Sequence, residues 1–404
     1  MQHRNPPGVG WDMADPQTAL SSFLGTLPAR PRLLGLGEPT HGLEVFPAWR
    51  NRIFQTLVQD HGFRSVALES DIIAGLQVNA YVTSGQGTLE EVMQTGFSHG
   101  FGAYAGNRAL VEWMRAFNAG RGPGDHLHFY GFDAPLEWWA PSPRASLLAL
   151  HEFLSRHLDD VPANTTTIEN LCGDEARWTN PAAVMDAAQS IGNGGDARHL
   201  RLLADDLSTR LRTGAPGLAA QPAFWEAELH ARTAMGLLQY HALLADPRPT
   251  RMARAAALRD LLMADNLGAI ARREGERGPT LVFAHNSHLQ RNTATMQLGG
   301  MRIEWWGAGA HASLRFGPHY AFIASHLDTA PERGIGDPAP DTLEGALMNP
   351  AHPAALFSAG ELTAALPREL TSRADIPPQA GYFPLQGPDL PLTDGVLFVK
   401  DAAS

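Results

Sequence analysis

The sequence has very little cysteine. Cys172 is the single cysteine among 404 residues, so the chain cannot form an internal disulfide bond or a cysteine-rich metal site. Nothing near Cys172 marks it as a nucleophile, and we expect a buried or helix-packed thiol. A chain without disulfide bonds fits a reducing compartment.

Long hydrophobic runs and basic clusters are missing as well. No segment reaches the length of a membrane span, and residues 1–8 lack the apolar core of an export signal. The chain has 42 acidic and 31 basic residues, and no basic block offsets its net charge of −11. This balance argues against a nucleic acid or an anionic membrane as the partner. We expect a cytoplasmic protein that acts on a small molecule without a cofactor.

What the sequence does contain is the pattern of a large α/β core. Hydrophobic residues make up 44% of the chain, enough for one elaborated domain or two smaller ones. The apolar run at residues 32–36 predicts a buried strand, residues 43–60 carry apolar side chains at helical spacing, and residues 64–70 form a second apolar run. A strand–helix–strand unit of this length has a right-handed crossover, so the two strands are expected to be parallel.

A long helical segment interrupts the strand pattern. A third strand is predicted at residues 127–133, and strands then disappear until residues 280–284, with further candidates at 320–325 and 396–399. We therefore predict an α/β fold with a mostly parallel sheet flanked by helices and a helical cap inserted between strands. The expected division is a first part of the α/β core at residues 1–140, a helical cap at 141–275 and a second part of the core at 276–404.

Two short motifs follow predicted strands, and both carry titratable side chains. They are Gly37-Glu38-Pro39-Thr40-His41-Gly42 and Ala284-His285-Asn286-Ser287-His288. Two further strands end in an acid, Glu69 and Asp133. Because the carboxyl ends of parallel strands meet at one edge of a sheet, we expect these groups to line one site, with Asp133 in a supporting position.

The residue types favour acid–base chemistry on water or another hydroxyl group. An imidazole titrates near neutral pH and can accept a proton from water, and a neighbouring carboxylate fixes its tautomer. Neither motif contains a nucleophile in a recognisable setting. Two histidines with two or three carboxylates would also suit zinc or manganese, so a metal site is an alternative. The expected position of the His-x-x-His pair at a strand end, rather than on a helix face, argues against it.

Taken together, the motifs resemble those of the erythromycin esterase family. The resemblance covers most of residues 30–310, and the combination of motifs is specific. In the family's order the sequence has Gly37-Glu38-x-x-His41-Gly42, then Arg50 nine residues beyond that histidine, Ala67-Leu68-Glu69, Trp113-Met114-Arg115-x-x-Asn118, Gly131-x-Asp133 and Ala284-His285-Asn286-x-His288.

This resemblance implies a function and a set of roles. Members of that family open the lactone ring of 14-membered macrolides with a histidine-activated water, without a covalent intermediate and without a metal. By this resemblance His41 is the general base, Glu69 or Glu38 orients it, and Arg50 stabilises the charge that develops on the carbonyl oxygen. The histidines of the second motif would position the substrate or protonate the leaving alkoxide. The residues implied to be catalytic are therefore His41, Glu69, Glu38, Arg50, His285 and His288.

Other functions stay open at this stage. The same base could act on a substrate hydroxyl group and so catalyse lactonisation, acyl transfer or cyclisation in a biosynthetic pathway. A non-catalytic protein could bind a macrolide or a glycan in the same pocket.

Structural roles are also possible for several residues. Glu38 and Glu69 could cap helices, and Arg50 could be a solvated helix residue. The tryptophan pairs at 138–139 and 305–306 predict core or pocket walls. Dinucleotide binding at the Gly/Ala run 307–310 is not expected, because no strand and helix are predicted to flank it.

Overall fold

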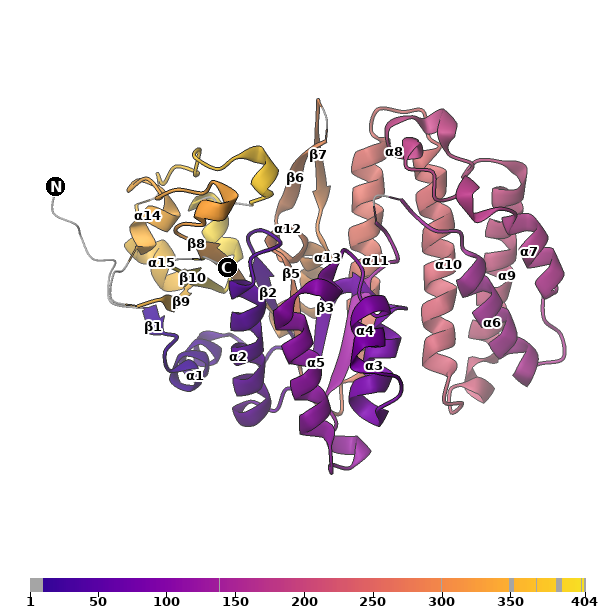
Figure 1. Ribbon diagram of the computed structural model, residues 1–404, viewed down its shortest axis with the longest axis horizontal. Helices are drawn as coiled ribbons and strands as arrows, with labels where there is room; N and C mark the ends of the chain where they lie inside the picture. The colour runs from indigo at the N-terminus through magenta and orange to yellow at the C-terminus, as the bar shows by residue number, and fades with distance from the viewer. Residues whose placement is uncertain are drawn as a thin grey trace.

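The computed structural model describes residues 10–137, 139–298, 300–348, 352–367, 369–382, 387–400 and 402. Residues 1–8, where no export signal is predicted, and Trp138 lie outside the described residues. Within the described part of the chain, no helix is both long and apolar enough to cross a membrane. The chain forms one large sheet with helices on both faces and a group of helices beside it (Figure 1).

Eight strands form the sheet, and their spatial order differs from their order along the chain. From one edge to the other they are β1 (Gly10–Asp12), β9 (Ala354–Ser358), β10 (Gly395–Val399), β8 (Tyr320–Leu327), β2 (Leu33–Glu38), β5 (Thr280–His285), β3 (Ser65–Asp71) and β4 (His128–Asp133). The pairs from β10 to β4 are parallel, whereas β9 is antiparallel to both of its neighbours. The predicted mostly parallel sheet and its six predicted strands are confirmed.

Alternate residues of the central strands pack into two layers, because successive side chains of a strand point to opposite faces. Leu34 and Leu36 of β2 contact the first layer, and Leu33 contacts the second. The first layer consists of α1 (Pro16–Thr26), α2 (Val45–Asp60), α3 (Gly75–Ser84) and α5 (Ala105–Asn118). The second consists of α11 (Arg251–Arg273), α13 (Ala308–Phe316) and α15 (Ala359–Ala365).

The connection from β4 to β5 contains the predicted helical insertion. Its helices α6 (Arg144–His157), α7 (Thr165–Cys172), α9 (Gly195–Leu218) and α10 (Phe224–Leu244) stand beside the sheet around a core of their own (Figure 1). Cys172 is buried in that core as a free thiol, as predicted.

The last helix of the insertion, α11, packs against both parts of the molecule. It contacts α10 on one side and β4 on the other, and its residues Met263, Leu267 and Ile270 belong to the core on the second face of the sheet. Helix α11 is therefore shared between the insertion and the sheet. The three-part division of the chain stays a prediction.

A two-stranded hairpin lies outside the large sheet. After the short helix α12 (Asn286–Leu289), strands β6 (Thr293–Leu298) and β7 (Met301–Trp306) pair in antiparallel fashion and extend away from the sheet beside α11 (Figure 1). Sequence reasoning missed this hairpin, although Met301-Arg302-Ile303-Glu304-Trp305 alternates apolar and polar residues as a half-exposed strand does, because only continuous apolar runs were taken as strands.

The hairpin corrects two expectations. Trp305 is buried, as predicted, but Trp306 is 55% exposed and so forms no core. The run at residues 307–310 does follow a strand, β7, and begins a helix, α13. That strand belongs to an antiparallel hairpin, however, and not to the parallel sheet that a dinucleotide-binding unit requires.

Candidate active site

The turn after β2 positions the first histidine. Glu38 is the last residue of β2, and its Oε1 atom accepts a hydrogen bond of 2.6 Å from Nδ1 of His41. Gly42 has a φ of 84°, and a side chain there would collide with the guanidinium group of Arg333, which donates to the His41 carbonyl oxygen over 2.8 Å. The other ring nitrogen of His41, Nε2, lies 3.7 Å from Oε1 of Glu69.

Two carboxylates make His41 more basic than a free imidazole. Burial lowers the pKa of His41, but the charge of Glu69 and the hydrogen bond that His41 donates to Glu38 outweigh burial and raise that pKa above its usual value. Burial raises the pKa of Glu38, and the hydrogen bond with His41 opposes this shift. Because Nδ1–H of the neutral ring donates to Glu38, Nε2 keeps a lone pair that can accept a proton.

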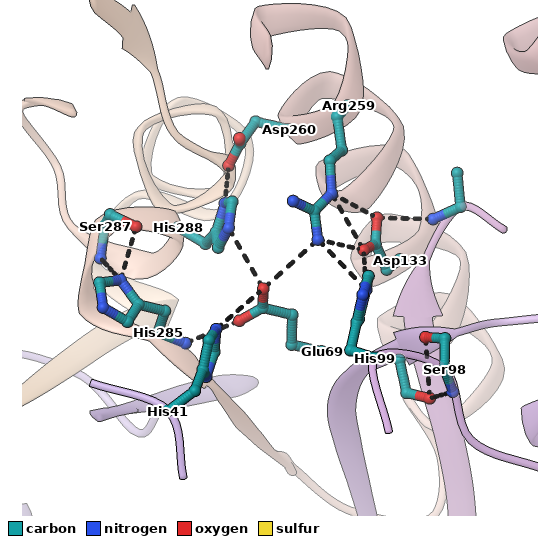
Figure 2. Close-up of polar contacts among 12 residues, drawn as sticks. His41, Glu69, Ser98, His99, Asp133, Arg259, Asp260, His285, Ser287 and His288 are labelled. Carbon is teal, nitrogen blue, oxygen red and sulfur yellow. Dashed lines mark hydrogen bonds and ion pairs between the residues drawn. The ribbon is translucent and has the colours of Figure 1, made fainter. Parts of the chain in front are cut away.

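Glu69, near the end of β3, lies at the centre of the site. Its Oε2 atom accepts the backbone N–H of His285 over 2.8 Å, and its Oε1 atom lies 3.3 Å from Nε2 of His288 and 3.4 Å from Nη2 of Arg259 (Figure 2). Burial alone raises the pKa of Glu69. The charges of His288 and His41 nevertheless hold it well below its usual range. Glu69 is therefore an anion shared by several donors.

Neither acid caps a helix. The side-chain contacts of Glu38 and Glu69 are to the groups just described, whereas Asp71, at the end of β3, accepts the N–H groups of Ile73 and Ala74. The helix-capping interpretation of the two glutamates therefore does not describe this structure.

The two histidines of the second motif have different surroundings. His285 ends β5, and its ring contacts Oγ of Ser287 at 2.7 Å and the carbonyl oxygens of Pro39 and Gly381 at 3.1 Å. Burial, reinforced by the charge of His41, lowers the pKa of His285 to about 3. This neutral ring connects the end of β5 to the turn after β2.

His288 lies on the short helix α12, not at the strand end that the sequence predicts for both members of the pair. Its Nδ1 atom donates over 2.8 Å to Asp260 on α11. Asp260 also accepts the Trp305 indole N–H over 2.7 Å and the Ala308 backbone N–H over 2.8 Å. Burial lowers the pKa of His288, but the charges of Asp260 and Glu69 raise it to about 10. His288 is therefore a cation at neutral pH.

Arg50 lies behind the site, on α2. Its side chain is completely buried and donates to the side-chain oxygens of Asn51 and Asn107 over 2.8 Å, and it stacks over the ring of Phe283. The solvated-helix interpretation of Arg50 is therefore wrong. Arg50 lines one small cavity together with Glu38 and Glu69, and burial lowers its pKa to about 9. Its role at the carbonyl oxygen stays a prediction, which this buried position does not favour.

A second arginine, which sequence reasoning missed, reaches the site from α11. Nε and Nη2 of Arg259 bind Oδ2 of Asp133 at 3.0 and 2.5 Å, so Asp133 holds this arginine beside Glu69 (Figure 2). His99 contacts Oδ2 of Asp133 at 3.1 Å and has a φ of 57°, in the left-handed region. The predicted supporting position of Asp133 agrees with these contacts.

A serine motif includes His99. From the sequence no Gly-x-Ser-x-Gly elbow is expected, yet residues Gly96-Phe97-Ser98-His99-Gly100 match that pattern. They follow helix α4 (Leu89–Thr95) and not a strand, as a nucleophile elbow would require. Oγ of Ser98 accepts the backbone N–H of Asp71 over 2.8 Å and lies 3.3 Å from Oγ of Ser70. Ser98 therefore has a structural role in this loop.

Of the missed residues, Asp260 left a signal in the sequence. Together with Met263, Ala264 and Leu267 it occupies one face of α11, and those three residues are buried. A carboxylate in an otherwise apolar helical stripe indicates a buried polar partner. Arg259 left no comparable signal, because arginine beside such a stripe is common on helix surfaces.

The site brings together a base, a buried anion and two cations. Among the described residues, no group of three or more histidine, cysteine, aspartate or glutamate side chains is arranged to hold a metal ion. A water molecule placed between His41 and Glu69 would have Nε2 as its proton acceptor, with His288 and Arg259 available as donors on the other side of Glu69.

Known proteins resemble this chain in both sequence and fold. A model of the erythromycin esterase family matches residues 58–393. Erythromycin esterase type II of Escherichia coli is 23% identical over 272 residues, which are 64% of this chain and 61% of that protein. The match therefore spans less than two-thirds of that relative.

Solved structures share the whole fold at low sequence identity. A Bacillus cereus protein has a TM-score of 0.70 at 18% identity, with 97% of this chain and 95% of the other covered. A variant of the erythromycin esterase EreC in its open conformation has a TM-score of 0.66 at 19% identity, with 95% of each chain covered. A succinoglycan biosynthesis protein has a TM-score of 0.63 at 18% identity, with 98% of this chain and 94% of that protein covered.

The family match begins after His41 and includes Glu69, Asp260 and the second histidine motif. Because it covers most of the chain, this protein belongs to the erythromycin esterase family.

Proposed function

We propose that the protein is a carboxylic ester hydrolase that opens a macrolide lactone with a water molecule activated by His41. The observation that carries this proposal is the geometry of His41. Its Nδ1–H donates to Glu38 over 2.6 Å, and Nε2 faces Glu69. A histidine held in this tautomer by a carboxylate is suited to remove a proton from water. Family membership supports an ester as the substrate, and the relative named erythromycin esterase supports a macrolide.

The reaction follows from these roles. Nε2 of His41 takes a proton from water while the water oxygen bonds to the carbonyl carbon, and the carbonyl electron pair moves to its oxygen. When the tetrahedral intermediate collapses, the ester C–O bond breaks and the leaving alkoxide takes a proton from His288. The proton on His41 then passes to His288 through Glu69 or solvent, so that both histidines regain their starting states and the net reaction consumes one water.

The test uses purified protein with a panel of 14-membered macrolides and simpler lactones, followed by mass spectrometry. We expect the product to gain the mass of one water. We expect His41→Ala to lower kcat by about 10³-fold, the scale of general-base catalysis, and to retain the wild-type fold, because the side chain is 39% exposed. His199→Ala, at an exposed position of α9, is the matched control and should leave kcat unchanged.

Four outcomes would contradict the proposed mechanism. An unchanged rate in His41→Ala would exclude this base, and a product without added water would favour cyclisation on a substrate hydroxyl group. Loss of activity in Ser98→Ala, with the fold retained, would point to a serine nucleophile. Metal analysis with and without chelator tests the remaining alternative: we expect full activity with chelator, and stoichiometric bound zinc would contradict a metal-free mechanism.

A further inference from the structure

Arg259 has one terminal nitrogen that its protein partners do not use. Nε and Nη2 bind Asp133, and Nη2 also approaches Glu69 and His99. Nη1 has no hydrogen-bond partner among the residues that the structure describes, and the side chain is 26% exposed. Figure 2 shows this unbonded nitrogen on the side of the guanidinium group that faces His288.

The surroundings of Arg259 fix the direction of that nitrogen. The carboxylate of Asp133 is completely buried, and besides Arg259 it accepts the N–H of Ala134 over 2.8 Å. The ring of His99 lies against both Asp133 and Arg259, and Glu137 binds the other side of that ring at 3.1 Å. A non-glycine residue with positive φ is held there only when its neighbours enforce the conformation, and such residues are found mainly at functional sites.

The proposed reaction creates negative charge beside an existing anion. Attack of water on the carbonyl carbon puts charge on the carbonyl oxygen, close to the ionised Glu69. A fixed donor next to Glu69 is needed to stabilise that charge, and donors of this kind supply a large share of catalysis in acyl transfer. Arg50 is less well placed for this task, because its side chain is completely buried and donates to Asn51 and Asn107.

We propose that Arg259 is a catalytic residue that donates a hydrogen bond from Nη1 to the carbonyl oxygen of the ester. The inference rests on the proposed hydrolase function and adds a residue of the helical insertion to its chemistry. Arg259 gives up no proton in this step: the guanidinium group stays charged while the carbonyl oxygen becomes negative and then returns to a carbonyl. His288 remains the donor to the leaving alkoxide, so the two cations have separate tasks.

The first arm of the test measures turnover. Arg259→Lys keeps the positive charge beside Asp133 and therefore the fold, but its one nitrogen lacks the planar fork by which arginine binds Asp133 with Nε and Nη2 and directs Nη1 elsewhere. We expect kcat to fall by about 10²-fold or more, as after loss of an oxyanion donor, with a smaller change in KM. The matched control is Arg254→Lys on the same helix, where the arginine is 45% exposed and pairs with Asp246; its kcat should stay at the wild-type value.

The second arm measures binding without turnover. Phenyl butylphosphonate is a tetrahedral monoanion that resembles the charged intermediate, and calorimetry reports its affinity. We expect wild-type protein and Arg254→Lys to bind it, and Arg259→Lys to bind it at least tenfold more weakly. Equal affinity in Arg259→Lys, or no binding to a wild-type protein that hydrolyses esters, would overturn this inference. Phosphonate binding lost only in Arg259→Lys, without hydrolysis of any ester by the wild type, would contradict the proposed function and leave the anion site in place.

Discussion

The two histidines on either side of Glu69 differ in their exposure and in the acids that hold them. The side chain of His41 is 39% exposed and is held by Glu38 alone, on a turn after β2. The side chain of His288 is 9% exposed and is held by Asp260, which also binds the hairpin and the start of α13. Both pKa values are raised against the effect of burial, that of His41 mainly by the charge of Glu69 and that of His288, to about 10, mainly by the charge of Asp260.

This difference assigns opposite tasks to two chemically identical side chains. A base needs a free nitrogen that faces the substrate, and His41, with Nδ1–H held by Glu38, presents Nε2 at the more exposed side of the site. A proton donor must keep its proton until the leaving group needs it, and His288 meets that condition on the buried side. Environments that separate the pKa values of paired groups are the usual means of assigning acid and base roles.

Among these variants, Glu69→Gln should have the largest effect on the two histidines. The carboxylate raises the pKa of both histidines, so its loss should lower both and remove the anion that holds His288 and Arg259 in place. We expect kcat to fall by about 10³-fold, the scale found when a group shared by a catalytic unit is removed. Steady-state kinetics measures kcat, and a thermal unfolding curve shows whether the variant keeps its fold. Asp71→Asn, on the same strand, is the control and should retain its kcat.

Glu38→Gln would test only His41, the more exposed of the two histidines. The amide can still accept from Nδ1 of His41, but the loss of the negative charge should lower the pKa of His41 and weaken its preference for the productive tautomer. We expect kcat to fall by about 10²-fold and the acidic limb of the pH profile to move to lower pH, because the base then loses its proton more readily. An acidic limb that stays in place would mean that another group titrates there.

Asp260→Asn would test His288, the more buried of the two histidines, and it should have the smallest effect on kcat at neutral pH. A protonated His288 is required, so activity should decline as the pH rises through its pKa of about 10. Removing the charge of Asp260 lowers that pKa, so the alkaline limb should move to lower pH while the acidic limb, set by His41, does not. At pH 7 we expect kcat to fall by about tenfold or less. If only the acidic limb of the pH profile moved, the roles of His41 as the base and His288 as the proton donor would have to be exchanged.

The sequence predicts the centre of the fold better than its edges. Strands such as β2 and β5 are buried on both faces and therefore appear as continuous apolar runs. The hairpin of β6 and β7 has no such run, and the edge strand β1 has only three residues. Burial on both faces makes a strand recognisable, and partial exposure removes that signal.

The same limit applies to the site. Glu38, His41 and Glu69 could be expected at one edge, because parallel strands deliver their carboxyl ends to the same side. The burial of Arg50 has the same kind of signal as that of Asp260, because Phe46 and Phe54 lie four residues to either side of it on α2 and both are buried. Arg259 lies 190 residues beyond Glu69 in the chain, and only the folded insertion brings the two within 3.4 Å.

Helix α11 has a consequence for how members of this fold can be recombined. Arg259 and Asp260 are consecutive residues on it, and the rest of the same helix packs on the sheet. Insertion of a single residue earlier in α11 would rotate both groups by about 100° about the helix axis. An exchange of the helices α6, α7, α9 and α10 between relatives should therefore end in the loop after α10, at residues 245–250, so that α11 stays with the sheet and keeps Arg259 and Asp260 in place.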